Sequence, residues 1–295
     1  MTIDLHLDTL WKMTKYGRFQ IAEGAPYSDV SALRMGEGQL DSAVFAIYLA
    51  QHYEIDAERL VGEQIDYFKR QVWPKGFTPY LAMENGALLE GKLSNVERYA
   101  KAGIVYLTLT HNYNNKLGCS ATNVSAEFDT GLTPFGHKVL VECERLGVLV
   151  DVSHASDLTA HDVLNASSKP VIASHSGCRK LLNHPRNITD TLIGQIAKTG
   201  GLIGVPFVKK FIGSHEAIAE HIDHIVQLVG ISHVAIGSDI DGAVLVDGAN
   251  TANWKYDFAN GLYKRGYGSD AIALIAGGNF ERLLSQRDSG KFPPR

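Results

Sequence analysis

The sequence has few cysteines and lacks long apolar runs. Its three cysteines, Cys119, Cys143 and Cys178, are widely spaced, odd in number and in no CxxC pair. This pattern indicates reduced, partly buried thiols rather than a disulfide framework. No apolar run reaches the roughly 18 residues of a membrane span, and no basic segment followed by an apolar one opens the chain. We therefore expect a protein of the reducing cytoplasm with no membrane partner.

A large excess of charge of either sign is also missing. The 295 residues include 28 basic and 32 acidic side chains, which gives a formal net charge of −4. So small a charge predicts no nucleic-acid partner and no anionic membrane surface. The glycine pairs Gly200-Gly201 and Gly277-Gly278 form neither a GxGxxG nor a P-loop pattern, so neither phosphate-binding loop is indicated.

No linker, repeat or change of composition divides the chain, so we expect one domain over residues 1–295. The hydrophobic fraction of 45% is that of a globular protein with a large core. Short apolar runs alternate with longer amphipathic segments, which is typical of βαβ units. The predicted strands are 3–7, 42–49, 78–83, 104–110, 148–152, 170–174, 202–205 and 233–237.

Helical patterns lie between these strands. The segment 57–71 places apolar side chains near helical spacing. The segment 133–146 has proline in its first turn and glycine just after its end. The predicted helices include 57–71, 133–146, 190–199 and 217–229. Eight strands separated by helices with right-handed crossovers favour a (β/α)₈ TIM-type barrel of the α/β class. A doubly wound open sheet is the alternative.

Side chains of the types that can bind metals, His, Asp and Glu, recur at the carboxyl ends of the predicted strands. They are His6 and Asp8 (first strand), Glu84 (third), His111 (fourth), His154 (fifth), His175 (sixth) and Asp239 (eighth). In α/β barrels the active site lies at this end, because the loops converge there. His6 and Asp8 are also two residues apart, so both point to one face of a strand. Imidazole nitrogen with carboxylate oxygen suits zinc and similar first-row metals.

Each of these residues has a simpler interpretation when it is taken singly. His154 or His175 could be a hydrogen-bonded core histidine, and Asp239 could be a turn residue. Their shared position at one end of the predicted barrel favours a metal site. By contrast, His221 and His224 are three residues apart on a predicted helix, where a solvated face is the better interpretation.

A set of short motifs follows a fixed order along the chain. They are Asp4-x-His6-x-Asp8, Glu84-x-Gly86, Tyr106-Leu-Thr-Leu-Thr-His111, Gly131-Leu-Thr-Pro-Phe-Gly136, Asp151-x-x-His154, Ser174-His175-Ser176, Arg186-Asn187, Gly237-Ser-Asp239-x-Asp241-Gly242 and Gly277-Gly-Asn-Phe280. In its order and spacing this set resembles the renal (membrane) dipeptidase family of zinc peptidases. The resemblance runs from residue 3 to about residue 285.

The resemblance implies an amidohydrolase-type barrel with two Zn²⁺ ions per chain. It implies that His6 and Asp8 bind one ion and that His154 and His175 bind the other. Glu84 would bridge both ions and so belong to the catalytic apparatus. The expected reaction is hydrolysis of a dipeptide, with a metal-bridging hydroxide as the nucleophile.

The same resemblance implies roles for three further residues. His111 and Arg186 would contact the substrate. His111 would donate a hydrogen bond to the developing oxyanion, and Arg186 would bind a carboxylate through two parallel hydrogen bonds. Asp239 would accept the proton of the attacking water and return it to the leaving amine. We expect tolerance of a D-residue at the C-terminal position of the dipeptide, and a homodimer is one arrangement compatible with this interpretation.

Two other functions stay open on the sequence. The same metal site could hydrolyse another amide or ester, such as a lactone, a cyclic imide or an N-acyl amino acid. Relatives of the phosphotriesterase type start from HxH and use a carboxylated lysine, whereas this chain has HxD and no lysine ending the third or fourth strand. A non-enzymatic barrel is the second alternative, but none of the expected ligand positions is missing.

Overall fold

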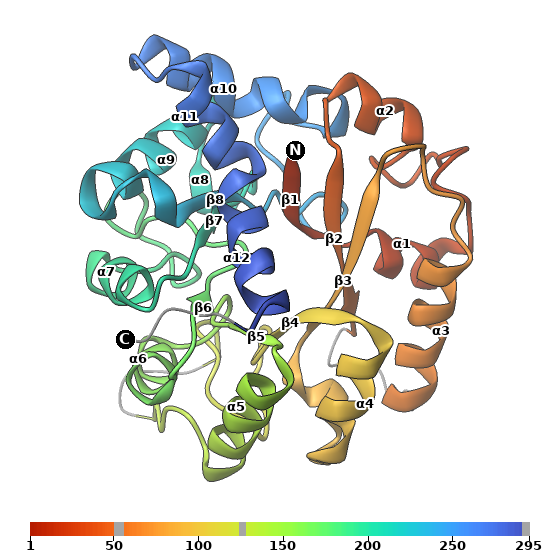
Figure 1. Ribbon diagram of the computed structural model, residues 1–295, viewed down its shortest axis with the longest axis vertical. Coiled ribbons are helices and arrows are strands. Elements are labelled where there is room, and N and C mark those ends of the chain that lie inside the picture. Colours follow the sequence, from red (N-terminus) through yellow and green to blue (C-terminus); the bar gives the residue numbers. More distant parts are fainter. Residues whose placement is uncertain (50–55, 124–127, 291–295) are drawn as a thin grey trace.

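Eight parallel strands occupy the centre of the molecule, and helices surround them (Figure 1). The computed structural model describes residues 1–49, 56–123 and 128–290. The strands are β1 (Ile3–Leu7), β2 (Ser42–Tyr48), β3 (Thr78–Glu84), β4 (Ile104–Thr108), β5 (Leu149–Asp151), β6 (Val171–Ile172), β7 (Ile203–Val205) and β8 (Val234–Ile236). The helices are α1 (Thr9–Tyr16), α2 (Ala32–Glu37), α3 (Ala57–Lys69), α4 (Ser94–Ala102), α5 (Pro134–Leu146), α6 (Asp157–Ala166), α7 (Asp190–Lys198), α8 (Lys209–Ile212), α9 (His215–Val229), α10 (Trp254–Lys264), α11 (Ser269–Ala273) and α12 (Asn279–Asp288).

The strands close into a barrel. They are hydrogen-bonded in the order β6-β5-β4-β3-β2-β1-β8-β7, and the two ends of this row meet at Ala173, just after β6. The N–H of Ala173 donates to the carbonyl of Leu202 at 2.9 Å, and the N–H of Gly204 donates to the carbonyl of Ala173 at 2.7 Å. The predicted (β/α)₈ barrel is confirmed, and the open doubly wound sheet is excluded.

Several strands are shorter than the sequence pattern predicts. Of the strand predicted over 170–174, only Val171–Ile172 forms β6, because backbone groups of the residues that follow make their hydrogen bonds elsewhere. The N–H of Ser174 donates to the Asp151 carboxylate at 2.8 Å rather than to a neighbouring strand. Side chains at the carboxyl ends of the strands thus replace part of the sheet.

The barrel interior is filled by side chains and closed at one end by α12, which crosses in front of the strands in Figure 1. Strand residues such as Leu5, Val44 and Leu149 form a buried apolar cluster with Phe280 and Leu283 of α12. A second apolar layer lies between the strands and the outer helices. Since α12 covers the amino ends of the strands, the carboxyl ends are left for a functional site.

The register of β1 is irregular between Asp4 and Leu7, where His6 lies. Leu5 belongs to the interior cluster, yet the His6 ring also faces the interior, since its Nδ1 lies 2.7 Å from the hydroxyl of Tyr106. Strict alternation would point neighbouring side chains to opposite faces. The irregularity therefore lets Leu5 and His6 share one face.

Buried thiols and a buried histidine lie around the strands. Cys119, Cys143 and Cys178 are buried and unpaired, which confirms the predicted thiols. His221 is also buried, and its Nδ1 accepts a hydrogen bond from the N–H of Cys178 at 2.9 Å. The prediction of a solvated face is wrong for His221, because α9 turns this side chain toward the segment after β6. Within the described ranges, no helix combines the length and apolar character needed to cross a membrane.

Candidate metal centre

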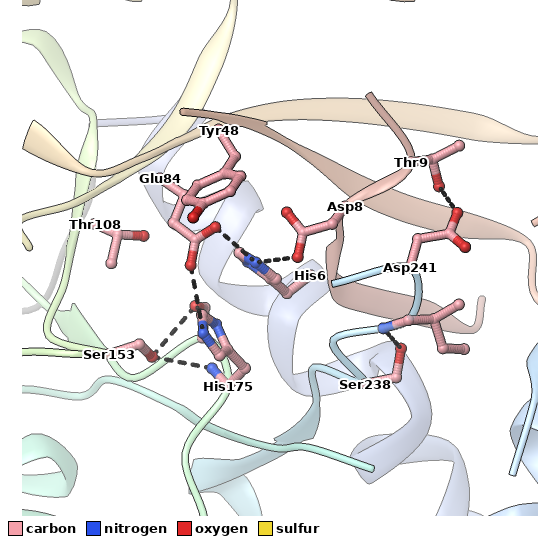
Figure 2. Close-up of polar contacts among 12 residues, drawn as sticks. His6, Asp8, Thr9, Tyr48, Glu84, Thr108, Ser153, His175, Ser238 and Asp241 are labelled. Carbon is pink, nitrogen blue, oxygen red and sulfur yellow. Dashed lines mark hydrogen bonds and ion pairs between the residues drawn. The ribbon is translucent and has the colours of Figure 1, made fainter. Parts of the chain in front are cut away.

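The structure brings five candidate ligands together at the carboxyl ends of the strands, and Figure 2 shows four of them, His6, Asp8, Glu84 and His175. The five are His6, Asp8, Glu84, His154 and His175, and each is at most 6% exposed. His6 lies in β1, Glu84 is the last residue of β3, and the others lie in the segments that follow β1, β5 and β6. The site is thus at the opposite end of the barrel from α12.

The Glu84 carboxylate lies between His6 and Asp8 on one side and His175 on the other (Figure 2), and His154 lies beside His175. Glu84 Oε2 is 3.6 Å from His6 Nε2, and Asp8 Oδ2 lies 3.6 Å from the same nitrogen. Glu84 Oε1 is 3.1 Å from His154 Nε2 and 3.6 Å from His175 Nε2. Atoms bound to one tetrahedral zinc at about 2.0–2.1 Å lie roughly 3.3 Å apart. These separations are therefore compatible with one ion on each side of Glu84.

A hydrogen bond fixes the tautomer of His6. The Tyr106 hydroxyl donates its only proton to the carbonyl of Leu5 at 2.9 Å, so it must accept from His6 Nδ1–H at 2.7 Å. His6 Nε2 then points toward the carboxylates. Although burial lowers the pKa of His6, its acidic surroundings raise this pKa well above the ordinary value. The position next to Nε2 therefore attracts a proton or a cation.

A chain of hydrogen bonds fixes the tautomer of His175 in the same way. The Ser174 hydroxyl donates to Asp151 Oδ2 at 2.6 Å, so it accepts from His175 Nδ1–H at 2.8 Å. The backbone N–H of His175 donates to the hydroxyl of Ser153 at 3.0 Å (Figure 2). His175 Nε2 thus carries a lone pair that faces Glu84. Partners of this kind behind a ligand histidine are common in metal sites.

The centre holds more lone pairs than hydrogen-bond donors. In the described chain, His6 Nε2 and Asp8 Oδ1 are buried without a hydrogen-bond partner. His154 Nε2 lies 3.0 Å from His175 Nε2, so without a cation only a shared proton can hold these nitrogens together. Burial lowers the pKa of both imidazoles well below the ordinary value, which keeps them neutral. The residues present therefore fit a metal ion.

Asp239 lies just after β8, beside Asp8. Its backbone is in the left-handed region with φ of 63°, and ligand atoms of His6, Asp8 and Asp239 all lie within 4.8 Å of one another. A Cβ atom on Gly242 would collide with the carboxylates of Asp8 and Asp239, so this approach requires glycine. Burial, and then the charge of Asp8, raise the pKa of Asp239 well above its ordinary value. A carboxyl group with a raised pKa is suited to proton transfer.

His111 lies three residues after β4 and also faces the centre. Its Nε2 is 3.9 Å from Glu84 Oε1, and its ring centroid is 4.3 Å from that of His154. Its Nδ1 lies 3.4 Å from the hydroxyl of Tyr48. Burial, and then the charge of Arg186, lower the pKa of His111 to about 3. His111 is therefore a neutral imidazole at pH 7 and can donate one N–H.

Arg186 reaches the centre from the segment between β6 and α7. It is only 3% exposed; its Nη2 donates to the carbonyl of His175 at 3.3 Å, and its Cζ lies 5.1 Å from the centroid of the Phe211 ring. Its Nε has no partner in the described chain. Burial lowers the pKa of Arg186 to about 10, despite the nearby carboxylates of Asp239 and Glu84. A charged guanidinium with an unused N–H is suited to bind an anion.

Two neighbouring cavities open at this end of the barrel. The first, of about 220 Å³, is lined by the acids Asp8, Glu84 and Asp239, by His111 and His154, and by aromatic side chains that include Trp11 and Tyr48. The second, of about 530 Å³, is lined by His184, Arg186 and Lys210, among other residues. Asn112 and Phe211 line both cavities, which places the two side by side.

The sequence did not indicate the residues that hold the candidate ligands in place. Tyr106, Asp151 and Ser174 stood in the motifs, but no role followed from their spacing. Asp151 orients His175 because β5 and β6 are paired, with Asp151 opposite Ile172. Trp11 of α1 carried no sequence signal at all, since its place in the first cavity depends on how α1 packs beside β2.

The chain shares sequence with proteins that are named as dipeptidases. Residues 74–291 match the membrane dipeptidase family, peptidase family M19. An uncharacterised dipeptidase of Schizosaccharomyces pombe is 37% identical over 170 residues, and Dipeptidase verJ of Clonostachys rogersoniana is 35% identical over 189 residues. These matches cover 55% and 62% of this chain but 41% and 48% of the relatives. The chain thus spans about half the length of the curated relatives it matches.

Solved structures share the fold over nearly the whole chain. A metallo peptidase from Rhodobacter sphaeroides, liganded with a phosphinate mimic of the dipeptide L-Ala-D-Ala, has a TM-score of 0.87 at 22% identity, covering 97% of this chain and 99% of that chain. The probable dipeptidase PvdM from Pseudomonas aeruginosa has a TM-score of 0.86 at 21% identity, covering 98% and 96%. At these identities the likeness shows the fold alone. The match over residues 74–291 shows the family, and the chain belongs to the membrane dipeptidases of peptidase family M19.

Proposed function

We propose that this protein is a zinc-dependent dipeptidase with two ions per chain. The observation that supports this most is the position of Glu84, whose two carboxylate oxygens face separate sets of ligand atoms. In the proposal, His6 and Asp8 bind one ion, His154 and His175 bind the other, and Glu84 binds both. Neutral imidazoles and carboxylates are a ligand set that suits zinc.

In the proposed reaction the ions, Asp239 and His111 have different roles. When bound, the ions would lower the pKa of a water molecule and polarise the carbonyl of the peptide bond. Asp239 would accept the proton of that water and deliver it to the leaving amine, a task that suits its raised pKa. His111 would donate its N–H to the carbonyl oxygen as negative charge develops there.

Arg186 would bind the free C-terminal carboxylate of the substrate. The charged guanidinium of Arg186 lies beside the proposed ligand His175 and has an Nε–H without a partner in the described chain, which suits it to bind a carboxylate. This contact would limit the enzyme to short peptides with a free carboxylate. We also propose tolerance of a D-residue at the C-terminal position. The phosphinate mimic of L-Ala-D-Ala held by the metallo peptidase from Rhodobacter sphaeroides supports it.

The experiment is an assay of zinc-loaded protein against a panel of L,L and L,D dipeptides. We expect hydrolysis in both series. The control is Asp239→Asn, which keeps the proposed ligands and should lower turnover by about 10²–10⁴-fold. If no dipeptide is cleaved, the proposed function is wrong. If Asp239→Asn turns over as fast as the wild type, another group moves the proton.

A further inference from the structure

The second cavity beside the metal centre is lined by basic and polar groups. His184, Arg186 and Lys210 line it together with the amides of Asn112 and Asn123, and in the described chain no Asp or Glu belongs to its lining. Its volume of about 530 Å³ exceeds the 220 Å³ of the first cavity. The space can therefore hold a side chain in addition to a carboxylate bound at Arg186.

Lys210 brings to this cavity a charge that no acidic side chain of the described residues neutralises. The adjacent Lys209 pairs with Asp247, with its Nζ 2.8 Å from Oδ2, whereas Lys210 has no acidic partner among the residues that the structure describes. The positive field reaches His184, whose pKa is lowered by burial and then by the charges of Arg186 and Lys210. The second cavity thus carries positive charge that a ligand could balance.

Phe211 links the two segments that supply this charge: it belongs to α8, as Lys210 does, and it contacts the segment between β6 and α7 that carries Arg186. Its ring lies 5.1 Å from Arg186 Cζ and 4.9 Å from the His184 ring. The side-chain amide of Asn187 donates to the carbonyl of Phe211 at 2.8 Å, which fastens α8 to the segment that carries Arg186. A ligand bound by Arg186 is therefore held in the cavity that Lys210 also lines.

We propose that the second cavity binds an acidic side chain, so that dipeptides ending in aspartate or glutamate are the preferred substrates. This inference rests on the proposed dipeptidase function. With the C-terminal carboxylate on Arg186 and the peptide bond at the metal centre, the C-terminal side chain enters the second cavity. Lys210 then pairs with its carboxylate, and the amides of Asn112 and Asn123 offer N–H donors. An apolar side chain would offer these groups no partner, and Lys210, which is exposed to solvent, would keep its water instead.

The test compares kcat/KM for Ala-Glu and Ala-Gln, which have similar shapes but differ in charge, in both L,L and L,D forms. We expect a preference of about tenfold for Ala-Glu, which falls as the salt concentration rises. Lys210→Met should remove the preference. Lys209→Met is the matched control, because it removes the neighbouring charge that is paired with Asp247, and it should keep the wild-type preference.

Each outcome separates the inference from the proposed function. Equal kcat/KM for Ala-Glu and Ala-Gln, or a preference that survives Lys210→Met, overturns the inference and leaves dipeptidase activity intact. Cleavage of no dipeptide overturns both. Calorimetry provides a readout without catalysis: zinc-loaded protein should bind free glutamate about tenfold more tightly than glutamine, and Lys210→Met should abolish the difference. Equal binding of the two amino acids by the wild type contradicts the inference.

Discussion

At the scale of single residues, the proposed metal centre is prepared by the hydrogen bonds behind it. Tyr106 receives the Nδ1–H of His6 and Ser174 receives that of His175, so both Nε2 atoms face the Glu84 carboxylate. The sequence could predict the candidate ligands, because each lies at or just after the carboxyl end of a strand, at the same end of the barrel. It could not supply the partners, since Tyr106 is 100 residues from His6 along the chain.

Tyr106→Phe tests the hydrogen bond behind His6. Without the hydroxyl, Nδ1–H loses its partner and the ring is less well oriented, so zinc affinity should fall by about 10–100-fold. Competition with a coloured chelator measures this affinity. Tyr99→Phe is the control, because the buried hydroxyl of Tyr99 has no partner in the described chain and its removal should leave the affinity unchanged. Equal affinities in the two variants would show that Tyr106 does not orient the ligand.

Glu84→Gln tests the proposed bridge. A neutral amide keeps the shape of the side chain but removes the charge that both ion positions share, so both should lose affinity together. Metal analysis after gel filtration should find less than one zinc ion per chain, with the fold retained by circular dichroism. Retention of two tightly bound ions would rule out the bridging role.

At the scale of elements, periodicity predicted where strands and helices lie better than where they end. The bounds of β1 agree with the prediction, whereas β6 stops early because Ser174 bonds to the Asp151 side chain. The segment between β6 and α7 carries Arg186 and follows no periodic pattern. Its course is set by pairwise contacts such as that of Arg179 with Asp157, 2.5 Å apart, which a single sequence does not reveal.

Two glycine substitutions test how the helices are built. Gly62 lies exposed inside α3 with nothing within 4 Å of an added Cβ, so Gly62→Ala should raise the free energy of unfolding by about 0.5–1 kcal/mol. Gly103 ends α4 with φ of 104°, so Gly103→Ala should lower it by about 1 kcal/mol or more. Urea denaturation measures both. Equal effects of the two substitutions would contradict this assignment of backbone conformation.

At the scale of the whole molecule, closure of the barrel creates the site. The candidate ligands range from His6 to His175 and come from the ends of four strands, so they meet only when the sheet is closed. The repeated strand–helix pattern allowed this architecture to be predicted, but the contact of Ala173 with β7 that closes it had no signal in the sequence. Location in the cytoplasm, a homodimer and one domain over residues 1–295 stay predictions.

Zinc should therefore stabilise the entire fold. An ion that binds only the closed barrel adds about 2.7 kcal/mol to the free energy of unfolding when its concentration is 100 times the dissociation constant. We expect the midpoint of thermal unfolding to rise with added zinc and to fall after treatment with a chelator. The control variant is Asp247→Asn, which removes one partner of an exposed ion pair and should keep the full rise of the midpoint with zinc. Asp4→Asn is not a suitable control, because Trp254 and the backbone of His6 donate hydrogen bonds to the Asp4 carboxylate. A midpoint that does not change with zinc would contradict this prediction, because it would show that closure of the barrel is not coupled to metal binding.

The proposed metal centre is tested most directly by counting the zinc that stays bound to the purified protein after exhaustive dialysis. Elemental analysis of the wild-type chain should give two zinc ions for each polypeptide, one on either side of Glu84. Protein that is folded by circular dichroism but retains no zinc, even after reconstitution, would contradict it.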